Sequence, residues 1–229
     1  MDMIADKLMQ VRARIAAACE GAGRDVRSVT LLAVSKTQPA LAVRAAWAAG
    51  ERRFGENYVQ EGIDKIAALA DLRDALEWHL IGPLQSNKTR LVAEHFDWVH
   101  TLDRLKIAQL LSAQRAAQRA PLQVCLQVNI SAQASKSGAA PAELPELAHA
   151  VAALPGLRLR GLMAIPEPST DPAAQAAPYR ALRSLFESLR AQGLPLDTLS
   201  MGMSDDLEAA IGEGATLVRV GSAIFGTRR

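Results

Sequence analysis

Eight short apolar segments that alternate with helix-like segments restrict the fold of this chain more than any other feature. Most of these segments are rich in Val, Leu or Ile and are bounded by polar residues, which is typical of strands buried on both faces. The segments between them repeat apolar residues at helical spacing. The predicted strands lie at residues 29–36, 52–57, 77–82, 97–102, 122–130, 157–165, 197–202 and 216–221.

Strict alternation of strands and helices predicts a parallel sheet with right-handed crossovers. Eight such units within 229 residues favour a closed (β/α)8 barrel of the TIM type, preceded by an extra helix at about residues 3–20. Periodicity alone leaves an open doubly wound sheet as the alternative. No linker-like break interrupts the pattern, so we expect residues 1–229 to form a single domain.

The composition excludes several classes of protein. The 26 basic residues nearly balance the 24 acidic ones, and aromatic residues make up only 4% of the chain, so we expect no nucleic-acid partner. Cys19 and Cys125 are too few for a disulfide framework and are expected to be buried free thiols. No segment has the run of about 18 apolar residues that a membrane span needs, and the amphipathic start is no signal peptide. We therefore expect a cytoplasmic protein without a membrane partner.

The residues at the predicted strand ends indicate an anion site, because parallel barrels bind ligands at the carboxyl ends of their strands. The seventh strand leads into Ser200-Met201-Gly202-Met203-Ser204 and the eighth ends with Arg219, Gly221 and Ser222. Phosphate sites are commonly built from the loops after these two strands. The alternative is that Ser204 only caps the following helix, with Asp205 and Asp206 complementing the helix dipole.

Lys36 ends the first strand, in "LLAVSKTQPA". A lysine at a strand end can simply extend its amine into solvent. At a barrel mouth beside a phosphate site, however, a lysine suits a ligand that carries both an aldehyde and a phosphate, such as pyridoxal 5′-phosphate (PLP). Arg219 next to a pyridine nitrogen would keep that nitrogen unprotonated and weaken the ring as an electron sink; the alternative is a salt-bridged arginine.

Several longer motifs carry a family resemblance. They are "AVSKTQP", "FGENYVQEGIDK", "WHLIGPLQSNKTR", "VNISAQASKSG", "LRGLMAIP", "LSMGMSDDLEAAI" and "RVGSAIFG", spread from about Leu31 to Gly226. Together they resemble the pyridoxal phosphate homeostasis protein family. The resemblance implies a fold-type III barrel similar to the N-terminal domain of alanine racemase. It also implies PLP binding and a role in PLP supply and amino-acid homeostasis, without established turnover.

The resemblance implies a role for individual residues. Lys36 would hold PLP as a Schiff base, and Arg219 would face the pyridine nitrogen. His79 also has the alternative of being a hydrogen-bonded core histidine. We expect Lys136 to be a solvated loop lysine, and contact with a phosphate-bearing ligand is its alternative. The phosphate would be held by Ser200, Gly221 and Ser222, with backbone N–H groups near Met201 and Gly202. The ring would be surrounded by Asn57, His79 and Met163.

Two functions from different classes follow from these expectations. The first is a monomeric, non-catalytic PLP carrier that buffers the cofactor and delivers it to PLP-dependent apo-enzymes. The second is a PLP-dependent, racemase-like enzyme, which needs acid–base groups on both faces of its substrate. In racemases the partner tyrosine comes from a second domain, whereas this sequence ends at Arg229 and contains only Tyr58 and Tyr179. We therefore expect the carrier; a decarboxylase-like barrel remnant that acts as a partner-binding module is a third possibility.

Overall fold

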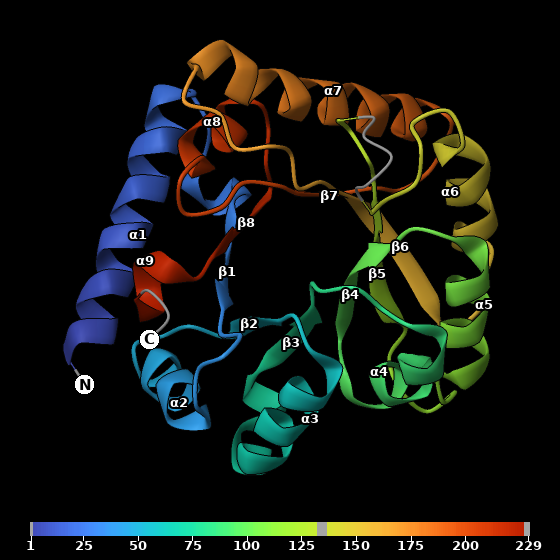
Figure 1. The fold of residues 1–229 in the computed structure, drawn as a ribbon, viewed down its shortest axis with the longest axis horizontal. Coiled ribbons are helices and arrows are strands. Elements are labelled where there is room, and N and C mark those ends of the chain that lie inside the picture. Colours follow the sequence, from blue (N-terminus) through green and yellow to red (C-terminus); the bar gives the residue numbers. More distant parts are fainter. Residues whose placement is uncertain (1, 132–136, 227–229) are drawn as a thin grey trace.

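The computed structural model describes residues 2–131 and 137–226, within which eight parallel strands form one closed barrel (Figure 1). Each strand pairs with the next along the chain, and β1 also pairs with β8, which closes the sheet. The closure confirms the predicted barrel and excludes the open sheet. The strands are β1 (Thr30–Val34), β2 (Arg53–Glu56), β3 (Glu77–Leu80), β4 (Trp98–Leu102), β5 (Leu122–Gln127), β6 (Leu157–Met163), β7 (Thr198–Ser200) and β8 (Leu217–Val220).

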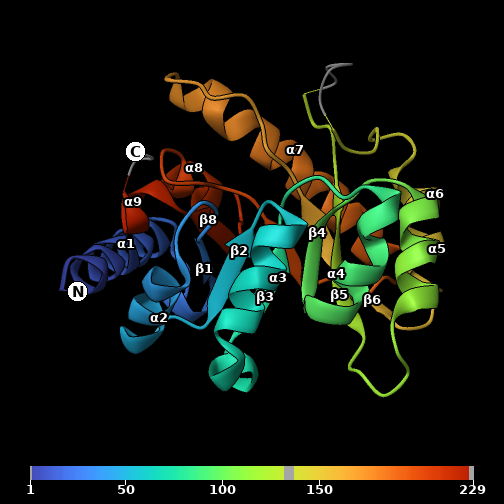
Figure 2. The ribbon, with the colours of Figure 1, turned by 60° about the horizontal axis from the view of Figure 1, so that its bottom comes forward.

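Helices cover the outside of the barrel (Figures 1 and 2). The α-helices are α1 (Asp2–Gly21), α2 (Ala40–Ala48), α3 (Val59–Ala68), α4 (Thr89–His95), α5 (Leu105–Gln114), α6 (Leu144–Ala152), α7 (Pro172–Ala191), α8 (Leu207–Gly212) and α9 (Ser222–Phe225), and the 3-10 helices are η1 (Val26–Ser28), η2 (Ala70–Ala75) and η3 (Ser86–Lys88). The predicted extra helix is α1, which packs against α8 and α9 in both views. It therefore joins the chain's first element to its last ones.

Side chains on the strands alternate between two environments, as the strand period of two requires. On β1, Leu31 and Ala33 belong to the main hydrophobic core between the barrel and its helices. Leu32 and Val34 belong instead to a small separate cluster. We take this second face of β1 to be the interior of the barrel, which side chains fill in an eight-stranded closure.

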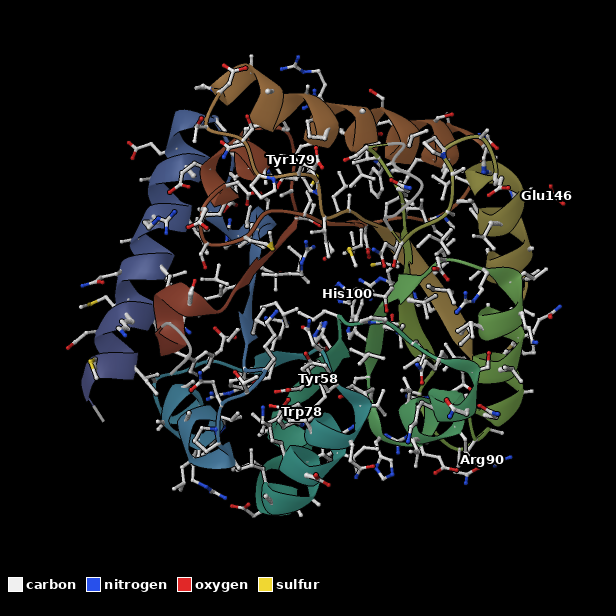
Figure 3. All side chains as sticks on the ribbon, in the orientation of Figure 1. Tyr58, Trp78, Arg90, His100, Glu146 and Tyr179 are labelled. Atoms are coloured by element: carbon white, nitrogen blue, oxygen red, sulfur yellow. The ribbon has the colours of Figure 1, made fainter. Side chains whose placement is uncertain are left out.

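Polar side chains share that interior. His79, His100 and Ser200 have no solvent-exposed surface, and Arg219 is only 4% exposed. Figure 3 shows His100 toward the middle of the ring of strands, whereas Tyr179 lies at α7. Burial of so many polar groups is tolerated only where they are hydrogen bonded to one another.

Gly161 allows β6 and β7 to approach each other. A Cβ atom at this position would lie 1.7 Å from the backbone oxygen of Thr198, which no side chain can tolerate. The register of β6 against β5 also shifts beside this residue, between Val124 and Cys125. The glycine thus serves strand packing rather than ligand binding.

Three further findings concern the described part of the chain. Cys19 and Cys125 are buried free thiols, as predicted. None of the described helices combines the length and apolar character that crossing a membrane requires. Across residues 2–131 and 137–226, no group of three or more His, Cys, Asp or Glu side chains is arranged to hold a metal ion.

Candidate functional site

A cavity of about 510 Å³ lies at the carboxyl ends of the strands. This is the end of the barrel where the predicted ligand residues were expected to meet. Five of the ten predicted residues line it, together with apolar side chains and the loop that follows β7. The lining residues are Val34, Lys36, Thr37, Gln38, Asn57, Ile81, Ile165, Met203, Ser204, Asp205, Arg219, Gly221, Ser222, Phe225 and Gly226.

Lys36 is half-buried and follows β1 directly. The next residue, Thr37, has a φ of 63°, a left-handed conformation that is rare for a β-branched residue. The Thr37 backbone N–H donates to the Glu61 carboxylate on α3, which holds the chain in this turn. Strain of this kind persists only where surrounding contacts maintain it and is frequent at functional sites.

A buried ionic network next to Lys36 fixes the ends of β1 and β2. The Ser35 hydroxyl donates to Glu56 Oε1 at 2.5 Å, and Lys65 Nζ on α3 donates to the same oxygen at 2.8 Å. Lys65 also donates to the Ser35 backbone oxygen at 2.6 Å. Burial raises the pKa of the Glu56 carboxyl, while the neighbouring Lys65 opposes that shift. From the sequence, Glu56 could be recognised only as a strand-end residue, and its pairing with Lys65 was missed.

Asn57 carries an unmet hydrogen-bond acceptor at the cavity. Its Oδ1 atom is buried and has no hydrogen-bond partner among the described residues. An unsatisfied buried acceptor costs about 1–3 kcal/mol, so this atom indicates a place for a ligand donor. Gly82 makes room beside it, because a Cβ atom there would lie 2.0 Å from the Asn57 backbone oxygen.

Arg219 forms part of the cavity wall from inside the barrel. Its Nη1 donates to the Ser200 backbone oxygen at 2.6 Å and to Ser200 Oγ at 2.8 Å, and its Nη2 donates to the Ala164 backbone oxygen at 3.0 Å. Burial lowers the pKa of the guanidinium, but an arginine keeps its proton in a folded protein. These partners are uncharged, so the structure assigns Arg219 hydrogen bonds where the alternative interpretation expected a salt bridge.

Two hydroxyl groups lie together at the loops after β7 and β8. Ser222 Oγ donates to Ser204 Oγ at 3.1 Å, and Gly221 immediately precedes α9. The interpretation of Ser204 as a helix cap is wrong, because α8 starts at Leu207 and its N-cap residue is Asp206.

The two carboxylates of this loop have different surroundings. The Asp206 carboxylate accepts hydrogen bonds from the Met203 backbone N–H and from the Tyr179 hydroxyl. It does not belong to the cavity lining, whereas the exposed Asp205 does. Asp205 therefore brings a negative charge to the side of the cavity where an anion was expected.

The other five predicted residues are not part of the cavity lining. Met163 packs with Trp98 and Cys125 in a small buried cluster. The Met201 backbone N–H donates to the Leu217 oxygen at 3.1 Å and so belongs to the sheet. Their ligand-binding roles stay predictions. Lys136, which was expected to be a solvated loop lysine, lies outside the described residues. All five are buried: His79, Met163, Ser200, Met201 and Gly202.

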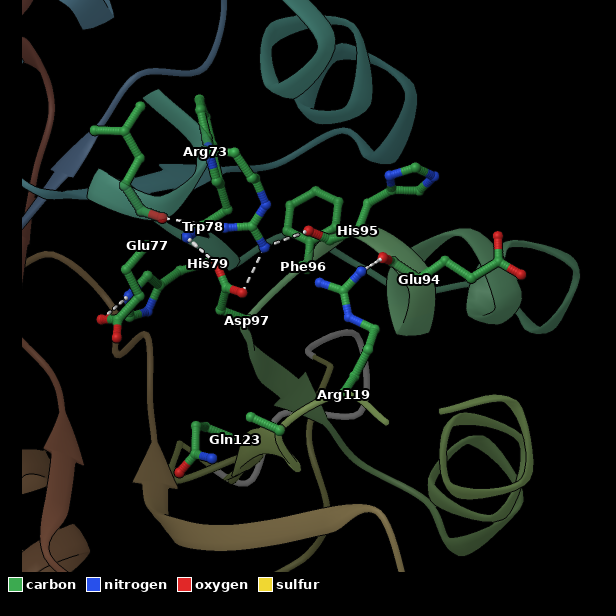
Figure 4. Close-up of polar contacts among 12 residues, drawn as sticks. Arg73, Glu77, Trp78, His79, Glu94, His95, Phe96, Asp97, Arg119 and Gln123 are labelled. Carbon is green, nitrogen blue, oxygen red and sulfur yellow. Dashed lines mark hydrogen bonds and ion pairs between the residues drawn. The ribbon is translucent and has the colours of Figure 1, made fainter. Parts of the chain in front are cut away.

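His79 has the contacts of its alternative interpretation, the hydrogen-bonded core histidine. Its Nε2 lies 2.9 Å from Glu77 Oε1 and its Nδ1 lies 2.9 Å from His100 Nε2. Figure 4 shows His79 and Glu77 side by side, at the start of β3. His100 was not predicted as a site residue; its place inside β4, one strand from His79, was its only sequence signal.

Comparison with known proteins identifies the family. The family model for the alanine racemase N-terminal domain matches residues 8–229. A relative from Pseudomonas aeruginosa is 64% identical over all of this chain and 97% of its own length. A relative from Escherichia coli K12 is 58% identical over all of this chain and 98% of its own length. Both relatives carry the name pyridoxal phosphate homeostasis protein.

Solved structures agree with this result. PipY of Synechococcus elongatus without PLP has a TM-score of 0.87 and 41% identity, over 97% of this chain and all of PipY. PipY with PLP bound has a TM-score of 0.85 and 40% identity, with the same coverage. Alanine racemase from Corynebacterium glutamicum shares the fold alone, with a TM-score of 0.69 and 18% identity over 62% of its chain. The match across residues 8–229 and the high identity to the curated relatives place this chain in the alanine racemase N-terminal domain family, among the pyridoxal phosphate homeostasis proteins.

Proposed function

We propose that this chain binds PLP in the cavity at the carboxyl ends of its strands and holds it for delivery to PLP-dependent apo-enzymes, without turning over a substrate. The observation that carries the proposal is the convergence of a lysine, an unmet acceptor on Asn57, a buried arginine and a hydroxyl pair in one cavity. Its volume is in the range of small-ligand sites. The names of the relatives and the PLP-bound structure of PipY support the same ligand.

The residues present fit this ligand. When bound, PLP supplies an aldehyde that can join an amine covalently and a phosphate that needs hydrogen-bond donors. Lys36 supplies the amine, and the Ser204 and Ser222 hydroxyls donate to the phosphate, while Gly221 lets the backbone approach closely. Ser204 thus takes the place at the cavity that the sequence suggested for Ser200. Asn57 Oδ1 accepts from a donor on the ring.

Arg219 supports a binding role over catalysis. Its fixed positive charge at the cavity wall keeps a neighbouring ring nitrogen unprotonated and so limits the ring as an electron sink. The tyrosines are also poorly placed to serve as the second acid–base group. Tyr58 is 59% exposed and does not line the cavity. Burial, together with its hydrogen bond to Asp206, raises the pKa of Tyr179.

Substitution of Lys36 tests the proposal directly. Wild-type protein mixed with PLP should develop the absorbance band of a covalently linked cofactor, and borohydride followed by peptide mass spectrometry should locate the label on Lys36. Lys36→Ala should lose both signals, because Lys36 is the one lysine among the described residues that line the cavity. Lys106→Ala, which changes an exposed lysine on α5, is the control and should keep both. A Lys36→Ala protein with an undiminished band would contradict the assignment.

The racemase-like alternative is favoured by one observation, the Asp205 carboxylate, which brings a second acid–base group to the cavity that Lys36 also lines. Chiral chromatography after incubation of the PLP-loaded protein with single amino-acid enantiomers separates the two functions. We expect no interconversion. Turnover that disappears in Asp205→Asn would replace the carrier function by the racemase-like one.

A further inference from the structure

A chain of hydrogen bonds crosses the interior of the barrel from Arg219 to Glu77. Arg219 Nη1 lies 2.8 Å from Ser200 Oγ, which lies 2.8 Å from His100 Nδ1. His100 Nε2 lies 2.9 Å from His79 Nδ1, and His79 Nε2 lies 2.9 Å from Glu77 Oε1. The members come from β8, β7, β4 and β3. Every link has the length of a good hydrogen bond.

The two ends of this hydrogen-bond chain lie at opposite mouths of the barrel. Arg219 lines the cavity at the carboxyl ends of the strands. Glu77 is the first residue of β3 and lines a second cavity, of about 440 Å³, which it shares with Asp197 and Arg160. Figure 4 shows the Glu77 end, with Glu77 beside His79. The hydrogen bonds therefore connect the proposed cofactor site with the opposite face of the molecule.

The protonation states of these side chains give all the hydrogen bonds between them the same direction. Burial lowers the pKa of His79, although Glu77 opposes the shift, and burial with a contribution from Arg219 lowers the pKa of His100 well below its usual value. Each imidazole is therefore neutral at pH 7 and carries one N–H group. Because the Glu77 carboxylate only accepts, His79 must donate through Nε2 and accept through Nδ1.

The remaining hydrogen bonds toward Arg219 have the same direction. His100 must donate from Nε2 to His79 and accept at Nδ1, so the Ser200 hydroxyl donates to His100. Ser200 Oγ then offers its lone pairs to the Arg219 guanidinium, which can only donate. Both histidines are thus Nε2–H tautomers, and every donor along the chain points from the arginine toward the carboxylate.

The two ends of the hydrogen-bond chain, Arg219 and Glu77, carry charges of opposite sign. Burial alone would raise the pKa of the Glu77 carboxyl, but the hydrogen bond from His79 and the charge of Arg53 keep that pKa below its usual value. Glu77 is therefore ionised at neutral pH. Hydrogen bonds aligned between a cation and an anion polarise one another, which strengthens each link. The carboxylate at one mouth thereby stabilises the guanidinium at the other.

We propose that Glu77, His79 and His100 are positioning residues that orient Arg219 through Ser200, so that the N-terminal mouth of the barrel controls how tightly the cofactor site holds its ligand. The identity of that ligand, PLP, rests on the proposed function. The hydrogen-bond chain is present in the ligand-free protein, and it is tested first in that state.

Nitrogen NMR on ligand-free protein labelled with ¹⁵N-histidine tests the direction of the chain. His79 and His100 should both appear as neutral Nε2–H tautomers whose ring protons exchange slowly with water, because neither side chain is exposed. In Glu77→Gln the amide oxygen still accepts but the charge is gone, so the His79 Nε2–H proton should move upfield. An Nδ1–H tautomer at either histidine would overturn the proposed direction.

Titration with PLP tests the coupling to the cofactor site. We expect Glu77→Gln to bind PLP about fivefold more weakly than wild type, which is at the low end of the affinity changes that couple distant sites. We also expect it to shift the absorbance maximum of the bound cofactor. The matched control is Asp197→Asn, which removes a carboxylate from the same mouth that pairs with Arg160 and not with the histidines. Equal weakening in both variants, or binding by Glu77→Gln at the wild-type level, would overturn the proposal.

Failure of this inference and failure of the proposed function remain distinguishable. If wild-type protein does not bind PLP, the proposed ligand is wrong and so is the coupling to it. The histidine tautomers measured without ligand still test the hydrogen-bond chain from Arg219 to Glu77. If Glu77→Gln does not fold, Ser200→Ala breaks the chain at its other end. Ser200→Ala should shift the His100 Nδ1 resonance strongly, because the hydroxyl that donates to this nitrogen is removed. An unchanged resonance would refute the proposed hydrogen-bond chain.

Discussion

The central histidine of the barrel should make the protein sensitive to mild acid. His100 has no exposed surface and accepts at Nδ1 from Ser200, and burial lowers its pKa well below the usual 6.5. The unfolded chain regains the ordinary value and therefore binds more protons than the folded chain below about pH 6.5. The free energy of unfolding consequently falls as the pH is lowered through that value.

The size of the effect follows from the proton bound by the unfolded chain. Between pH 7 and pH 5 an ordinary histidine gains most of one proton, whereas a His100 that stays neutral gains none. Integrating this difference gives about 2 kcal/mol of stability lost from this residue. The figure is a substantial part of the roughly 5–15 kcal/mol that stabilises an average domain.

Replacement of His100 by a side chain that does not titrate isolates this contribution. We expect His100→Gln to be less stable than wild type at pH 7 but to lose about 2 kcal/mol less between pH 7 and pH 5. Urea unfolding followed by circular dichroism at both pH values measures the difference. His149→Gln, which changes an exposed histidine, is the control and should match the wild-type slope. Wild type and His100→Gln with the same pH dependence would refute the assigned neutral, buried state.

Two further predictions concern stability near the site and within the sheet. Lys65→Met should destabilise the protein by about 3–5 kcal/mol, because it leaves the buried Glu56 without its ion pair. The control Arg44→Met breaks an exposed pair and should lose far less stability in chemical denaturation; equal losses would contradict the assigned network. Gly161→Ala should lower the melting temperature strongly, since its Cβ atom would meet the backbone oxygen of Thr198, and a melting temperature within a degree or two of wild type would contradict the reported strand approach.

The barrel could be predicted because its signal is local and repeated. Most strands are marked by an apolar run and the helices by the spacing of their apolar residues, and eight repetitions within this length leave few topologies. Lys36 at the end of β1 and the Ser- and Gly-containing loops after β7 and β8 were placed at one mouth by the same rule. The cavity contains residues from all three segments.

Which of several neighbouring side chains reaches the cavity could not be predicted in the same way. Ser200 and Ser204 flank the same loop, and the sequence favoured Ser200. In the structure Ser200 ends β7, points to His100 and Arg219, and is fully buried, while Ser204 reaches the cavity and Ser222. The pairing of Ser200 with Leu217 and the closure of the sheet decide this.

The sequence by itself determined the order of strands and helices, the end of the barrel where the cavity lies, and the lysine at that cavity. Only the tertiary structure decided that Lys65 reaches Glu56 and that Glu77, His79 and His100 lie in line with Arg219. The physical reason is that periodicity reports which face of an element is apolar. The distances across a closed barrel depend instead on strand register and tilt, which no short segment encodes on its own.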